Sequence, residues 1–144
     1  MKNNKLHLEA KAFDKIVEKR IKNGFNPDLK KKNIIKYFYN NPWRYPETRY
    51  FTFTKKISFI LKYCKKNDLV LDVGCGLGTL SMELARSNIN VTAIDISKKS
   101  IDYAKKFSKK SLTKKQYSRI NYQQMPISQI INDPKKYKFN CIIF

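Results

Sequence analysis

The chain has 144 residues, 42% of them hydrophobic, which is enough for one domain with a buried core. Its 31 basic and 11 acidic residues give a formal net charge of +20 at pH 7. The N-terminal stretch MKNNKLHLEAKAF lacks the apolar core of a secretory signal, and charges interrupt every segment long enough to span a membrane. We therefore expect a protein without a membrane span, located in the cytoplasm.

The basic excess consists of 26 Lys and only 5 Arg, alongside 13 Asn and 16 Ile. This composition indicates a solvated surface shaped by an AT-rich genome. The alternative is a face that binds nucleic-acid phosphates, although Arg is the preferred residue for such contacts.

Cysteine and histidine usage excludes several kinds of site. Three cysteines, Cys64, Cys75 and Cys141, show neither zinc nor redox spacing, and their odd number argues against a disulfide framework. A reducing compartment fits them best. The single histidine, His7, lies in a stretch that we predict to be mobile, so no Ser-His-Asp triad or histidine metal site can be built.

The N-terminal third is predicted to be helical. Residues 8–22 place apolar side chains at helical spacing and predict an amphipathic helix, with Phe13, Ile16, Val17 and Ile21 on its apolar face. Gly24 follows as a C-terminal stop signal. The segments after it are predicted as a second helix, a loop with two prolines and a third helix, over residues 28–39, 40–47 and 54–64.

Aromatic residues gather in this third of the chain: Tyr37, Phe38, Tyr39, Trp43, Tyr45, Tyr50, Phe51 and Phe53. Either they form a lid that recognises a substrate, or they pack a helical layer against a sheet. Packing is the favoured interpretation for most of them, while the polar tips of Tyr and Trp suit one or two to a pocket.

Residues 69–85 (LVLDVGCGLGTLSMELA) predict a strand, a tight turn and the start of a helix. The glycines Gly74, Gly76 and Gly78 permit positive φ angles and let a ligand approach the backbone. The free N–H groups of the following helix point into the same space. This stretch therefore predicts a nucleotide-type site at the carboxyl end of the first strand, with Thr79 and Ser81 available to cap the helix.

The spacing of the glycines in this loop limits the classes of ligand that it can bind. A dinucleotide loop reads G-x-G-x-x-G, whereas here the glycines follow G-x-G-x-G and Thr79 comes next. Asp72, two residues before the first glycine, would repel a pyrophosphate but suits an amine-bearing ligand. The stretch resembles motif I, D/E-x-G-x-G-x-G, of the class I S-adenosylmethionine-dependent methyltransferases. The resemblance implies that Asp72, Gly74, Cys75, Gly76 and Gly78 surround the methionine part of S-adenosylmethionine, with Cys75 a small tolerated residue.

Residues 90–96 (NVTAIDI) alternate small and β-branched side chains and predict a second strand that ends at Asp95. An acid at this place in a nucleotide-binding α/β fold accepts hydrogen bonds from both ribose hydroxyls. The alternative is that Asp95 caps the next helix, although Ser97 can take that role. The stretch also resembles motif II of the same family, which implies that Asp95 binds the ribose and Ile96 packs on the adenine.

The remaining elements complete the predicted sheet. Two helices, a lysine-rich linker and two strands are predicted at residues 97–110 (helix), 112–119 (linker), 120–123 (strand), 127–131 (short helix) and 139–144 (strand). Members of the family often carry an acid after the third strand that holds the adenine amino group. Gln124 and Met125 stand there instead. Either Gln124 or backbone N–H groups are expected to make this contact.

The expected fold is an α/β Rossmann-like parallel sheet of order 3-2-1-4, with residues 1–65 as a helical cap and residues 66–144 as the cofactor-binding core. Outside that core the resemblance is weak: Asn41-Pro42-x-Arg44 is similar to a segment of ubiquinone-biosynthesis O-methyltransferases. A complete class I domain has seven strands, ordered 3-2-1-4-5-7-6. We expect a fragment or a truncated gene product, or else a partner that completes the sheet, including self-association through the edge of the fourth strand.

The resemblance implies methyl transfer from S-adenosylmethionine to an acceptor, with a small molecule favoured over RNA. It identifies no catalytic base and no metal ligand. An RNA-directed methyltransferase fragment and a non-catalytic remnant that binds the cofactor are the alternatives.

Overall fold

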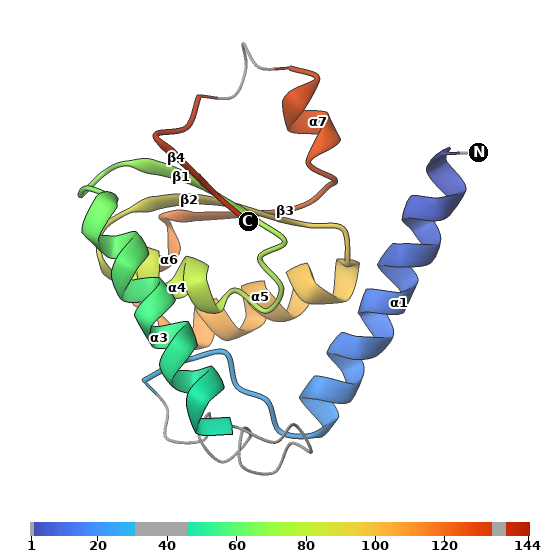
Figure 1. The fold of residues 1–144 in the computed structure, drawn as a ribbon, viewed down its shortest axis with the longest axis horizontal. Coiled ribbons are helices and arrows are strands. Elements are labelled where there is room, and N and C mark those ends of the chain that lie inside the picture. The colour runs from blue at the N-terminus through green and yellow to red at the C-terminus, as the bar shows by residue number, and fades with distance from the viewer. Residues whose placement is uncertain (1, 31–45, 134–137) are drawn as a thin grey trace.

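The computed structural model describes residues 2–30, 46–133 and 138–144 (Figure 1). Within them a four-stranded parallel sheet has the order β3-β2-β1-β4, which confirms the predicted order 3-2-1-4. The strands are β1 (Leu69–Val73), β2 (Asn90–Asp95), β3 (Ile120–Gln124) and β4 (Cys141–Ile143). Because the strands are parallel, the carboxyl ends of β1 and β2 meet at one edge of the sheet.

Helices surround this sheet and connect its strands. They are α1 (Lys2–Lys22), α3 (Pro46–Tyr63), α4 (Thr79–Arg86), α5 (Lys98–Ser111), α6 (Lys114–Tyr117) and α7 (Ser128–Ile131). Figure 1 shows α4 and α5 on one side of the sheet and α7 on the other, while α1 packs beside α5 and α3 beside α4. None of the helices in the described ranges is long and apolar enough to cross a membrane.

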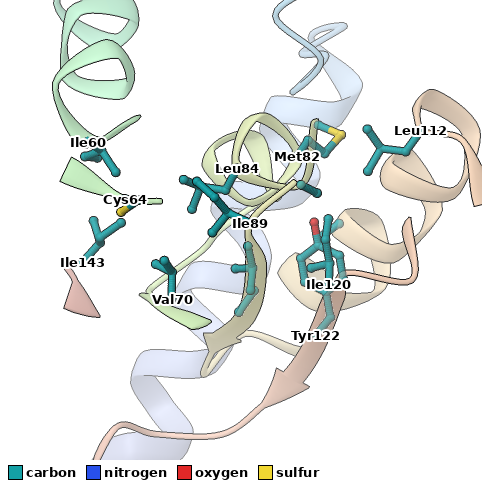
Figure 2. Packing of buried hydrophobic residues seen from close by; sticks show 14 of the residues in the cluster. Ile60, Cys64, Val70, Met82, Leu84, Ile89, Leu112, Ile120, Tyr122 and Ile143 are labelled. Carbon is teal, nitrogen blue, oxygen red and sulfur yellow. The ribbon is translucent and has the colours of Figure 1, made fainter. Parts of the chain in front are cut away.

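The core divides between the two faces of the sheet because neighbouring strand residues point to opposite sides. On the face covered by α4 and α5, strand residues such as Val70 and Val91 pack against Met82 and Leu84 of α4 (Figure 2). On the other face Leu71 and Ile94 form a smaller cluster that also contains Met125 and Ile130.

Three predictions about the helices are wrong. The N-terminal helix begins at Lys2, so His7 lies within a helix and not in a mobile stretch. Helix α3 begins at Pro46, inside the predicted loop, since proline fits the first turn of a helix. The predicted linker contains α6, where the Thr113 side chain and the Gln116 side chain cap each other's backbone N–H groups.

The predicted cap of α4 is also wrong, whereas the cap of α5 is confirmed. The N-cap residue of α4 is Gly78, which has a left-handed conformation and provides no side-chain cap, and Ser81 donates its hydroxyl to Asp72 instead. At α5 the Ser97 hydroxyl accepts from the Ser100 N–H at 2.9 Å.

Several expectations fall outside the described residues. Most of the predicted second helix over residues 28–39 lies there, as does the Asn41-Pro42-x-Arg44 segment. The same holds for the side chains of the aromatic group between residues 37 and 53.

Candidate functional site

The glycine loop after β1 is held against the end of β2. The N–H groups of Gly74 and Cys75 both donate to the Ile94 carbonyl, at 2.9 and 3.0 Å. The next N–H, that of Gly76, donates to the Asp95 carboxylate at 2.9 Å. The two stretches singled out in the sequence are therefore joined into one structure, with Asp95 facing the loop.

The three loop glycines have positive φ angles, but they serve two purposes. A Cβ added at Gly74 or Gly76 would meet no described atom within 4 Å, so both border open space. A Cβ at Gly78 would lie 2.4 Å from the Tyr122 hydroxyl. The first two glycines therefore leave room beside the loop, whereas the third allows α4 to start close against β3.

Asp95 is a partly buried acceptor with unused capacity. One carboxylate oxygen accepts from the Gly76 N–H and the other from the Ser97 N–H, the latter at 2.8 Å. Burial raises the pKa of Asp95, while these two hydrogen bonds oppose the rise. Since a carboxylate oxygen has two lone-pair sites, each oxygen can accept one further hydrogen bond from a ligand.

Asp72 at the end of β1 is more deeply buried, with 4% of its surface exposed. Its carboxylate accepts from the Ser81 hydroxyl at 2.6 Å. Burial raises the pKa of Asp72 to about 6, against the opposing effects of the Ser81 hydrogen bond and the Lys56 cation. A cationic group placed beside Asp72 would favour its ionised form.

Two clefts flank the glycine loop. The loop cleft has a volume of about 260 Å³, and its described lining includes Arg20, Lys56, Asp72 and the residues from Gly74 to Leu77. The helix cleft, of about 500 Å³, has walls from α1 and from the ends of β1, β2 and β3. Its lining includes Leu6, Glu9, Phe13, Gly74, Asp95, Ile96, Met125 and Pro126.

The two clefts differ in chemistry. The loop cleft combines two basic side chains, Arg20 and Lys56, with the carboxylate of Asp72, which suits a ligand group that carries both charges. The helix cleft is mainly apolar, with Asp95 at the loop, which suits a flat ring attached to a group bearing hydroxyls. Gly74 lines both clefts, so one elongated ligand can occupy the two together.

The predicted site residues fall into distinct places. Asp72, Cys75 and Gly76 line the loop cleft, and Asp95, Ile96 and Met125 line the helix cleft. Gln124 is exposed, and its side-chain amide donates to the Ile96 carbonyl at 3.2 Å, beside a smaller hollow next to the helix cleft. The described residues contain no cluster of three His, Cys, Asp or Glu side chains that could hold a metal ion.

Several lining residues were not foreseen as site residues, and among them are the four charged or aromatic side chains of Glu9, Phe13, Arg20 and Lys56. Lysine is too abundant in this chain for one residue to stand out. The other three come from α1, whose position on the sheet depends on contacts distant in sequence.

Sequence comparisons match this chain to known methyltransferases. A family model described as a methyltransferase domain matches residues 64–144. The ubiquinone biosynthesis O-methyltransferase of Rickettsia typhi is 38% identical over 84 residues, which are 54% of this chain and 32% of that protein. The protein of the same name from Coxiella burnetii is 39% identical over 72 residues, or 50% of this chain and 29% of its own. The chain thus spans about a third of the length of these curated relatives.

Solved structures agree on the fold. Magnesium protoporphyrin IX methyltransferase from Synechocystis, with bound S-adenosylmethionine, superposes with a TM-score of 0.58 and 19% identity, covering 73% of this chain and 50% of that one. A glycopeptide N-methyltransferase complexed with sinefungin gives a TM-score of 0.53 and 18% identity, covering 62% and 34%. At these identities the likeness concerns the fold alone.

Proposed function

The chain belongs to the methyltransferase domain family, and from this premise we propose that it binds S-adenosylmethionine and takes part in methyl transfer. The observation that carries the proposal is the pairing of Asp95 with the Gly76 N–H, at the junction of two clefts with complementary chemistry. In this proposal residues 66–144 form the cofactor-binding core and residues 1–65 the helical cap.

The cofactor would extend through both clefts. Its ribose hydroxyls would donate to Asp95, and the adenine would lie against Ile96 and Met125, with Gln124 near its outer edge. The methionine part would lie along Gly74, Cys75 and Gly76, whose missing or small side chains leave it room.

The charges of the loop cleft match an amino acid. The cofactor's ammonium would lie toward Asp72, and its carboxylate toward Arg20 and Lys56. Gly78 would act indirectly, since it shapes the start of α4 and lines neither cleft.

When bound, S-adenosylmethionine supplies an electrophilic methyl group, and the protein has to orient the cofactor. Asp95 and the loop would fix the two ends of the cofactor, so that the methyl group is held in one place for in-line attack. We propose a small-molecule acceptor, because the curated relatives are named for ubiquinone biosynthesis.

Nucleic acid is the second candidate acceptor, and the charge of +20 favours it. Such binding would weaken steeply as salt rises, because phosphate contacts release counterions. An RNA affinity that stays constant between low and high salt would remove this candidate.

The location of the protein in the cell and its self-association also stay predictions. One is a cytoplasmic location. The other is self-association through β4, which lies at the edge of the described sheet and exposes Ile142, with the exposed Phe144 directly after it. Sedimentation of the chain at several concentrations tests the second.

Calorimetric titration of the 144-residue chain with S-adenosylmethionine tests the main proposal. We expect a dissociation constant in the micromolar range. Methylthioadenosine, which lacks the amino-acid part, should bind at least about tenfold more weakly, because the charged groups of the loop cleft then stay unmatched. NAD serves as the dinucleotide control. A chain that is folded by circular dichroism and does not bind S-adenosylmethionine would contradict the proposal.

Asp72 makes cofactor affinity depend on pH. The cofactor's ammonium favours the ionised carboxylate, so below a pKa of about 6 binding must displace a proton. The affinity is then expected to fall by about tenfold per pH unit below that point. Calorimetry between pH 7.5 and 5 measures the slope, which the substitution Asp72→Asn should flatten, whereas Asp102→Asn on the surface of α5 should not. Equal slopes in the wild type and Asp72→Asn would exclude this role.

The same carboxylate affects the unliganded protein. Because the folded state holds the Asp72 proton more tightly than the unfolded state, stability falls as pH rises from 3.8 to about 6 and stays reduced above it. This difference corresponds to roughly 3 kcal/mol, since each pKa unit is worth about 1.4 kcal/mol. Thermal unfolding at pH 7.5 should therefore show a higher midpoint for Asp72→Asn than for the wild type.

A further inference from the structure

We infer that α1 forms the outer wall of the nucleoside end of this site, with the Phe13 ring against the base and the Glu9 carboxylate accepting a hydrogen bond from the base's exocyclic amino group. The inference rests on the proposed function and names the part of the chain that would select the base. Neither residue belongs to the glycine loop or to the ends of the strands.

The first support is the position of these residues on α1. Leu6, Glu9 and Phe13 follow one another at intervals of three and four residues, so they share one face of the helix. All three line the helix cleft, which also contains Asp95 and Ile96. Figure 1 shows α1 standing beside the connection from β2 to α5.

The second support is that α1 is fixed in this place by polar contacts. The Asp14 carboxylate accepts from the Ser97 hydroxyl at 2.5 Å and from the Lys99 N–H at 3.1 Å. Glu18 forms an ion pair with the Lys99 side chain. Ser97 in turn donates its backbone N–H to Asp95. Phe13, next to Asp14, is thereby tied to the carboxylate proposed to hold the ribose.

The third support is the distribution of acceptors in the cleft. Its described lining carries two carboxylates, Asp95 and Glu9, among mainly apolar side chains. Asp95 already accepts two N–H groups and is assigned to the ribose. Gln124 donates its amide to Ile96 and is not part of the lining. Within the described residues Glu9 is thus the acidic group left for the base.

The charge of Glu9 determines which base is accepted. A 6-amino group donates to a carboxylate, whereas a 6-oxo group would place its lone pairs against the same negative charge. Phe13 contributes differently, because an aromatic face stacks on any base. Phe13 lines the cleft and is 50% exposed, so a base stacked on its ring would cover apolar surface now open to water.

The test compares S-adenosylhomocysteine and S-inosylhomocysteine, whose bases carry an amino and an oxo group at this position and an unprotonated and a protonated N1 beside it. Calorimetry of the 144-residue chain should show the adenosyl form bound at least about tenfold more tightly, as expected for a hydrogen bond to a charged acceptor. Glu9→Ala should lower affinity for the adenosyl form by about tenfold and leave the inosyl form unchanged or tighter. Phe13→Ala should weaken both by about tenfold and preserve their ratio.

Two control variants separate these effects from general ones. Ile16→Ala removes another half-exposed side chain of α1 that lines neither cleft, and Asp102→Asn removes a surface carboxylate of α5. Both should leave the two affinities unchanged.

If Glu9→Ala shifts both ligands equally, or neither, the role of Glu9 is wrong even though the cofactor proposal stands. Unchanged affinities in Phe13→Ala would likewise remove the stacking contact. A folded wild-type chain that binds neither ligand would overturn the cofactor proposal itself.

Discussion

Replacing Asp95 with alanine is expected to lower the affinity for S-adenosylmethionine by at least about 100-fold. This is the largest effect on binding that we expect from a single substitution, because two hydrogen bonds to a charged acceptor are lost together. The same substitution removes the acceptor of the Gly76 and Ser97 N–H groups. The loop then keeps only the bonds that Gly74 and Cys75 donate to the Ile94 carbonyl of β2, so the substitution affects the cofactor and the loop at once. Calorimetry measures the loss.

A second substitution separates the two roles of Asp95. Asp95→Asn keeps one carbonyl oxygen that can accept from the Gly76 N–H, but it loses the negative charge. We expect an intermediate loss of about tenfold, with the fold retained by circular dichroism. Asp102→Asn, on the exposed face of α5, removes an equal charge and should leave binding unchanged. An affinity for Asp95→Ala within threefold of the wild type would show that the ribose is held elsewhere.

Gly78→Ala is expected to cost the most stability, about 3 kcal/mol, through backbone strain at a positive φ and overpacking against a neighbour. The added Cβ would lie 2.4 Å from the Tyr122 hydroxyl, which shares a 2.7 Å hydrogen bond with Ser108 in the core. Gly24→Ala is the matched control. Gly24 has the same φ of +80° but no described atom within 4 Å of an added Cβ. Urea unfolding should show a loss of only about 1 kcal/mol for this control.

A double-mutant cycle checks the cause of this loss. Tyr122→Phe removes the oxygen nearest to the added Cβ, so Gly78→Ala should cost less in that background than in the wild type. If the cost of Gly78→Ala is the same in both backgrounds, or equals that of Gly24→Ala, the contact with Tyr122 has no energetic role.

The central sheet was predictable because its signals are local. Apolar runs such as 69–73 and 90–95 end in glycine or acid, and parallel strands with helical crossovers allow few arrangements. The cap at Ser97 was predictable for the same reason, since it depends on residues three apart. Helix α6 was missed, although Thr113 and Gln116 carry a capping-box signal, because the lysines between them suggested a solvated linker.

The parts that could not be predicted depend on distant partners. Serine is a common helix-capping residue, but the buried Asp72 carboxylate needs a hydrogen-bond donor, and the Ser81 hydroxyl donates to it instead. The clefts depend on how α1 is docked, and the contact that docks it joins Asp14 to Ser97 across 83 positions of the chain. The spacing of apolar residues within α1 does not predict that Glu9 and Phe13 line a cleft.

The register of the sheet also has a consequence for biosynthesis. Strand β1 is central and is made before its neighbours: Leu69 pairs with Asn90, but the other side of β1 pairs Val70 with Cys141. At roughly 5–20 residues per second, a ribosome leaves that second side without its partner for about 4–14 seconds after β1 has emerged. During this interval the unpaired N–H and C=O groups along that side of β1 are open to other nascent chains. Assembly of β4 is therefore the step at which we expect chaperones to raise the yield of folded protein.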